Sequence, residues 1–116
     1  MSVLQENVLF QQSAFIHGQW MDAADQDRVL VTNPATDEVI GSIPNMGQIE
    51  AHQAVESSYQ ALQSWKALTA QARADLLLAW YKLTLEHAEE LARIMTIEQG
   101  KPLSEALGEV KYAASF

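Results

Sequence analysis

The hydrophobic pattern of this chain changes its period near residue 44. Before that point, short runs alternate apolar with polar residues or are rich in β-branched residues, which is typical of strands. Beyond it, apolar residues recur every three or four positions, as they do on one face of an α-helix. The pattern predicts an α+β chain, with strands and a β-hairpin in residues 14–44 and about four α-helices in residues 47–116.

The N-terminal half contains three strand-like runs. Residues 15–20 alternate, and Gly18 offers a turn, so this run is a strand or one arm of a tight hairpin. Residues 28–32 and 38–44 are two further strands, and the intervening residues 33–37 have the proline, asparagine and aspartate of a turn. We expect this pair to form a hairpin, which is marginal alone and needs a surface to pack against.

The second half contains recognisable helix ends. Glu50 lies in the first turn of the first helix, where the helix dipole favours a carboxylate. Thr69 is the expected N-cap of the second helix. The third helix runs from about Ala88 to Gln99, Gly100 follows it as a typical residue after a helix end, and Pro102 suits the first turn of the fourth helix.

The second helix is apolar around most of its circumference. Such a helix is normally covered on most sides. Gly108, inside the fourth helix, costs about 1 kcal/mol relative to alanine, which is tolerable if another backbone approaches closely there. The apolar residues 111–116 end the chain without a cap, whereas domain boundaries tend to be polar. We therefore expect a piece of a larger protein. The residues that widen the apolar face of the second helix are Leu77, Leu78, Tyr81 and Leu85.

Composition excludes several classes of function. Fifteen acidic residues against seven basic ones give a formal charge of -8, which disfavours binding to nucleic acid or to an anionic membrane. The absence of cysteine excludes disulfides, thiolate metal sites and cysteine nucleophiles within these residues. There is no secretory signal pattern, membrane span, phosphate loop, Gly-x-Gly-x-x-Gly or Gly-x-Ser-x-Gly motif. The expected location is the cytoplasm.

The histidines and tryptophans are weak candidates for a site. The histidines share no metal-ligand spacing, so we expect them at the surface or near helix caps. The tryptophans could form an aromatic ligand box, but at helical spacing they more often pack in cores. These residues are His17, His52 and His87, and Trp20, Trp65 and Trp80.

Three passages carry the most specific signal: residues 15–20 (FIHGQW), 31–44 (VTNPATDEVIGSIP) and 98–110 (EQGKPLSEALGEV). In this order and spacing they resemble the N-terminal region of the aldehyde dehydrogenase superfamily, and the resemblance covers residues 10–116. The ending, Tyr112 to Phe116, resembles most the succinate- and glutarate-semialdehyde dehydrogenase branch. Two positions depart from the family pattern: Asp37 stands where glycine is usual, and Ala72 where a capping glutamate is common.

The resemblance implies that residues 1–116 are the N-terminal part of the cofactor-binding domain of a larger α/β (Rossmann-type) enzyme. The parent enzyme would oxidise succinate or glutarate semialdehyde to a carboxylic acid with NAD or NADP. In that family a cysteine attacks the aldehyde and a glutamate activates water for deacylation. Both groups correspond to positions beyond this chain. We therefore expect no catalytic or cofactor-binding residue here, and no cofactor bound by this chain alone.

The resemblance also implies a possible ion site. Family members often hold a monovalent cation with backbone carbonyls at the end of the strand before Asn-Pro and with an acidic side chain of a later helix. The matching positions are Val31, Thr32 and Glu109. The alternative is that Glu109 is a solvated acid of the helix surface.

Two hypotheses for the whole chain follow. In the first, it is an inactive portion of a semialdehyde dehydrogenase that packs against the rest of that enzyme or self-associates through exposed apolar helix faces. In the second, it is a non-catalytic helical binding module that pairs with a dehydrogenase subunit. The apolar residues Leu77, Leu78, Tyr81 and Leu85 argue against the second, because an independent module would carry polar residues there. A third and weaker hypothesis is that the chain has dehydrogenase activity by itself.

Overall fold

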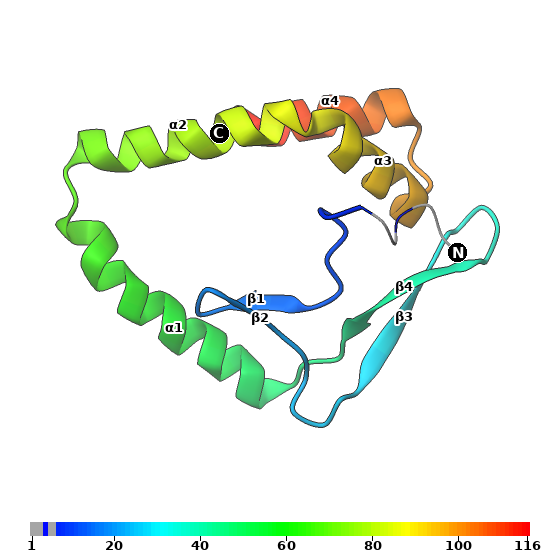
Figure 1. Cartoon of the computed structure of the whole chain (residues 1–116), viewed down its shortest axis with the longest axis horizontal. Coiled ribbons are helices and arrows are strands. Elements are labelled where there is room, and N and C mark those ends of the chain that lie inside the picture. Colours follow the sequence, from blue (N-terminus) through cyan, green and yellow to red (C-terminus); the bar gives the residue numbers. More distant parts are fainter. Residues whose placement is uncertain (1–3, 5–6) are drawn as a thin grey trace.

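Two small antiparallel sheets precede four helices in the computed structural model, which describes residue 4 and residues 7–116 (Figure 1). The predicted α+β class and the change of structure near residue 44 are confirmed. The strands are β1 (Ala14–Ile16), β2 (Gln19–Met21), β3 (Arg28–Thr32) and β4 (Val39–Pro44). The helices are α1 (Gln48–Ala67), α2 (Ala70–Glu86), α3 (Ala88–Gln99) and α4 (Leu103–Ala114).

Strands β1 and β2 form a complete tight hairpin. His17 and Gly18 make its turn with φ values of 53° and 74°, the left-handed conformation that two-residue hairpin turns favour. Phe15 and Trp20 lie opposite each other, with ring centroids 5.1 Å apart. The sequence suggested a strand or one hairpin arm, and the structure contains both arms.

Strands β3 and β4 form the predicted second hairpin, whose pairing is irregular between Val31 and Thr32. Val31 pairs with Gly41 and Thr32 with Val39, so Ile40 is an extra residue on β4. This irregularity accompanies the burial of Ile40, which is only 2% exposed.

The N-terminal segment packs over β4 at Gly41. A Cβ atom built on Gly41 would lie 2.7 Å from Oε1 of Gln12 and 2.9 Å from Cζ of Phe10. Oε1 of Gln12 also accepts a hydrogen bond from the backbone amide of Ser42, at 2.9 Å. A side chain at residue 41 would therefore require the ends of the Gln12 and Phe10 side chains to move while the segment is in place.

The helix ends predicted from the sequence are confirmed for α2 and α3. The Thr69 hydroxyl accepts a hydrogen bond from the amide of Ala72 at 3.1 Å and caps α2. Gly100 adopts φ 74° and donates its amide proton to the carbonyl of Thr96, which ends α3. Pro102 directly precedes α4. Within the described part of the chain, no helix has the length and apolar character required to cross a bilayer.

The best-packed part of the molecule lies between α3 and α4. Small side chains predominate there, so the two helices can approach closely. Partly buried Leu91, Met95 and Leu107 extend the cluster at its edge. The fully packed members are Ala88, Ala92, Ala106 and Val110.

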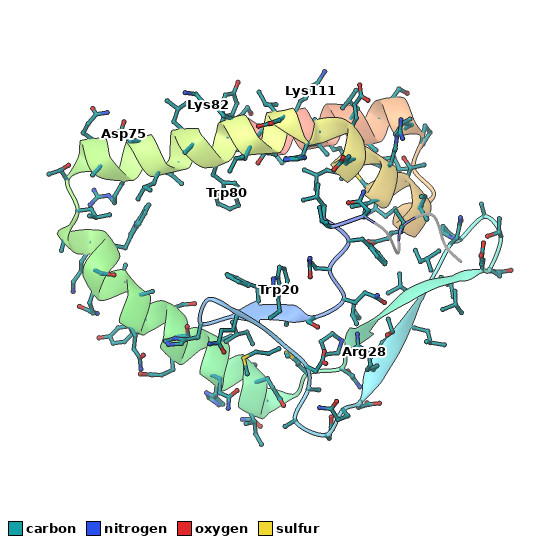
Figure 2. All side chains as sticks on the ribbon, in the orientation of Figure 1. Trp20, Arg28, Asp75, Trp80, Lys82 and Lys111 are labelled. Carbon is teal, nitrogen blue, oxygen red and sulfur yellow. The ribbon has the colours of Figure 1, made fainter. Side chains whose placement is uncertain are left out.

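Helices α1 and α2 form two sides of an open ring (Figure 1). Although α2 is described along its whole length, none of its residues is buried. The prediction that the tryptophans pack in a core is wrong for this chain, because the exposed fractions of Trp20, Trp65 and Trp80 are 54%, 37% and 69%. Trp80 points toward the inside of the ring, whereas Lys82 points away from it (Figure 2). The apolar side of α2 is therefore uncovered, as the sequence predicted.

The surroundings of Gly108 in α4 differ from those expected, because the sequence suggested that another backbone approaches it closely. No described atom outside its own helix backbone and chain neighbours lies within 4 Å of a Cβ atom built on Gly108. The close backbone that would make this glycine favourable is therefore not supplied by the described residues.

Candidate functional site

The residues predicted to bind a cation lie on two different elements. Val31 and Thr32 end β3, beside the irregularity in its pairing with β4. Val31 is half-buried and Thr32 is exposed. Glu109 lies in the middle of α4, and its side chain is 47% exposed.

The end of the β3–β4 hairpin meets the junction of α3 and α4. A Cβ atom built on Gly100 would lie 3.0 Å from Cγ of Pro34, so a side chain at this position would press on the hairpin turn and require the proline ring to shift. The left-handed φ of Gly100 independently favours glycine at this position.

The Glu109 carboxylate is occupied by a cation from within the chain. The ammonium group of Lys101 donates a hydrogen bond to Oε1 of Glu109 and forms an ion pair with it. This hydrogen bond, with the nearby negative charges of Glu109 and Glu105, raises the pKa of Lys101 above its ordinary value, against a smaller effect of desolvation. Among residue 4 and residues 7–116, no group of three or more His, Cys, Asp or Glu side chains is placed to hold a metal ion.

Arg28 joins three segments of the strand half and was not identified from the sequence. Its Nη1 donates to Oδ1 of Asp22 at 2.7 Å, and its Nε donates to Oγ of Ser42 at 2.8 Å. Its Nη2 donates to the carbonyl oxygens of Gln12 and Ser42. The hydrogen bond from Arg28, aided by one from Ser13, holds the pKa of Asp22 below its ordinary value of 3.8. The guanidinium fork thus ties the N-terminal segment and the loop after β2 to β4.

Glu50 links the start of α1 to the loop after β2. Its Oε1 accepts from the amide of Ala24 at 3.1 Å, and its Oε2 accepts from the amide of Gly47 at 3.0 Å. Glu50 is 8% exposed, and these backbone hydrogen bonds, that of Ala24 foremost, lower its pKa below the ordinary 4.5 although burial opposes the shift. The predicted position of Glu50 in the first helical turn is confirmed, and it caps the helix as well.

An apolar groove of about 910 Å³ lies between α2 and the end of α4, and we call it the α2–α4 groove. Leu77, Leu78, Trp80 and Tyr81 line one wall, and Phe116 contributes to the other. These side chains offer apolar area and aromatic faces, and the hydroxyl groups of Thr84 and Ser115 are among the few polar groups of the lining. The groove is therefore suited to bind an apolar surface.

The histidines lie where the sequence placed them. Nδ1 of His17 is 3.1 Å from Oγ of Ser57, a contact between the β1–β2 turn and α1. His87 lies between α2 and α3, with Nδ1 3.5 Å from a carboxylate oxygen of Glu90. His52 is an exposed residue of α1. They are surface and cap-adjacent side chains, as predicted.

Comparison with known proteins identifies relatives along nearly the whole chain. The model of the aldehyde dehydrogenase family matches residues 20–116. A glutarate-semialdehyde dehydrogenase of Pseudomonas putida is 51% identical over 113 residues, which are 97% of this chain and 24% of that protein. An NADP-dependent succinate-semialdehyde dehydrogenase of Escherichia coli is 50% identical over 97% of this chain and 23% of its own length.

Solved structures share the fold as well as the sequence. The crystal structure of an aldehyde dehydrogenase from Brucella melitensis biovar abortus superposes with a TM-score of 0.93 at 44% identity. The match covers 99% of this chain and 24% of that one. The chain therefore spans about a quarter of the length of the relatives that it matches.

Proposed function

Because this chain belongs to the aldehyde dehydrogenase family, we propose that it forms the N-terminal part of an NAD(P)-dependent dehydrogenase that oxidises succinate or glutarate semialdehyde to the corresponding acid. The observation that carries this proposal is the identity of 51% across 97% of the chain with a glutarate-semialdehyde dehydrogenase. Since the chain spans about a quarter of that relative, the activity is assigned to the whole polypeptide and not to these residues alone.

The contribution of these residues is structural. Oxidation of an aldehyde through a covalent thiohemiacetal needs a cysteine thiolate and a hydride acceptor, and the chain has no cysteine. One uncovered apolar surface is the α2–α4 groove, where Leu77 and Trp80 are 51% and 69% exposed. We propose that the remaining part of the dehydrogenase packs there, and that it also supplies the groups that bind NAD or NADP.

Exchange of the N-terminal segment tests this proposal. Residues 1–116 replace the matching segment of the Pseudomonas putida glutarate-semialdehyde dehydrogenase, and formation of reduced nicotinamide is followed with glutarate and succinate semialdehydes. We expect the chimera to retain kcat/KM within about tenfold of the parent enzyme, about 1.4 kcal/mol in barrier height, and the isolated chain to show no turnover. A chimera that folds and assembles like the parent but is inactive would contradict the proposal.

The exposed apolar faces also support a proposal about the isolated chain. Large apolar side chains at the α2–α4 groove, such as Leu77 and Trp80, are exposed, and exposed apolar patches favour association, so the chain alone is expected to self-associate there. The alternative is that the chain pairs with a separate dehydrogenase subunit. In that case the chain and the unmodified Pseudomonas putida enzyme, when mixed, would elute as a stable complex in size-exclusion chromatography. A cytoplasmic location remains part of the proposal and is testable by fractionation.

A further inference from the structure

One carboxylate of α4 binds a lysine that lies just before the helix, and a second carboxylate lies on the same face. Glu105 and Glu109 are four residues apart and therefore lie on the same face of the helix. Lys101 precedes α4 by two residues, and its Nζ donates a hydrogen bond to Oε1 of Glu109. The Lys101 side chain is 27% exposed, so its ammonium group is held against the helix and does not extend freely into water.

We propose that the ammonium group of Lys101 is the cation held by the Glu109 carboxylate, in place of a free monovalent ion. This inference departs from the site predicted at Val31, Thr32 and Glu109. That site needs the Glu109 carboxylate to be available, and the carboxylate is instead engaged by a neighbouring side chain of the same chain.

The chemistry of the two kinds of cation favours the tethered one. An ammonium group carries the same charge as sodium or potassium, and it also donates directed hydrogen bonds to carboxylate oxygens. A free ion would have to give up its freedom of translation, whereas Lys101 is already attached beside the site.

The backbone around Lys101 is restricted on both sides. Gly100 is in the left-handed conformation against Pro34, and the ring of Pro102 limits its own φ. The backbone on both sides of Lys101 is thus restricted independently of the ion pair. Less conformational entropy is therefore lost when the ion pair forms. The α3–α4 junction consequently carries its own counter-ion.

Thermal unfolding in three salts tests the inference on the full 116-residue chain. Sodium, potassium and choline chlorides are compared at equal ionic strength, because choline screens charge but is too large to replace an ammonium group at the Glu109 carboxylate. We expect the unmodified chain to unfold at the same temperature in all three salts. Lys101→Met should unfold about 2–4 °C lower in choline chloride and recover part of that loss in sodium or potassium chloride.

Matched variants make the outcome specific. Lys111→Met removes an equal charge from an exposed position of the same helix, and it should not create a dependence on the type of cation. Lys101→Met combined with Glu109→Gln should lose the recovery seen with Lys101→Met alone. Sodium-23 relaxation gives a second measurement that does not depend on unfolding. The excess of the sodium-23 relaxation rate over its value in buffer should be the same for the unmodified chain and for Glu109→Gln.

Two results would overturn the inference. One is an unfolding temperature of the unmodified chain that rises in sodium or potassium chloride, or an excess sodium-23 relaxation rate, that Glu109→Gln abolishes. A free ion would then bind beside Lys101. The other is a Lys101→Met chain that unfolds at the same temperature as the unmodified chain in every salt. The ammonium group of Lys101 would then not stabilise the chain.

Discussion

Pro34, in the turn of the β3–β4 hairpin, packs against Gly100 at the end of α3, and this contact joins the strand half of the molecule to the helical half. The two residues belong to two of the passages by which the sequence resembles its family. Their proximity gives a physical reason for both: the proline supplies the contacting ring, and the glycine leaves space for it while adopting φ 74°.

Gly100→Ala is expected to destabilise the chain by about 1–2 kcal/mol from the left-handed backbone conformation alone, with a further loss from the contact with Pro34. Urea unfolding followed by circular dichroism measures the change. Gly100→Asn separates the two causes, since asparagine tolerates the conformation but still fills the space.

Gly108→Ala is the matched control, because this glycine lies inside α4 and its Cβ would meet no described atom within 4 Å. In the isolated chain it should stabilise by about 1 kcal/mol through helix propensity. Equal destabilisation by both substitutions would show that the Pro34 contact is not the reason for Gly100.

The stability of the chain should depend on pH through Glu50. Its pKa is lower in the folded state than the ordinary 4.5, so its contribution is fully present above that pH and is lost as the pH falls through the folded pKa. Glu50→Gln should therefore be less stable than the unmodified chain near neutral pH, and the difference should shrink below pH 4.5. The free energy of unfolding is measured for both proteins across this range. A difference that does not vary with pH would contradict a role for the charged carboxylate.

Arg28→Lys should loosen the N-terminal segment although it keeps the charge. Lysine cannot reproduce the fork that reaches Asp22, Ser42 and the Gln12 carbonyl together. We expect faster hydrogen exchange at the Ser42 amide, which donates to the Gln12 side chain.

The control for this variant is Arg73→Lys, which alters a single hydrogen bond to the Leu68 carbonyl at the corner between α1 and α2. It should leave exchange at Ser42 unchanged. If Arg28→Lys behaves in the same way, the N-terminal segment is held by contacts other than the guanidinium group.

Trp80→Gln tests the role of the α2–α4 groove. In the isolated chain it should reduce self-association, which is measured by light scattering, because it removes a large apolar side chain that is 69% exposed. In the chimera with the Pseudomonas putida enzyme it should destabilise by about 3 kcal/mol or more, the loss typical of a buried tryptophan. Lys82→Gln, on the outer side of α2 (Figure 2), should change neither property. Equal effects of the two substitutions would show that this face is not covered in the whole enzyme.

Local structure was predictable because it depends on neighbouring residues. The hydrophobic period distinguished strands from helices, and Thr69, Gly100 and Pro102 placed the ends of three helices within a residue or two. The prediction for the tryptophans failed for a related reason. Periodicity shows which side of a helix should be covered, but it does not show whether the covering residues are part of the chain.

The contacts of the candidate site depend on how distant segments meet, and periodicity holds no information on that. Glu109 matched a family position, but its pairing with Lys101, two residues before α4, was not predicted. Arg28 looked like an ordinary strand residue, since its partners come from three separate segments. The departure at Asp37 is explained by its φ of 58°, a conformation that glycine adopts freely and aspartate tolerates.

Because Phe10 and Gln12 crowd Gly41, the effect of a substitution at this position depends on whether residues 10–12 lie across β4. Alanine there would collide with Phe10 and Gln12 only while that segment lies across β4. In a protein shortened to start at Ser13, the same methyl group would meet neither side chain. The penalty for Gly41→Ala, compared between the long and short proteins, therefore measures how firmly Phe10 and Gln12 are held against β4.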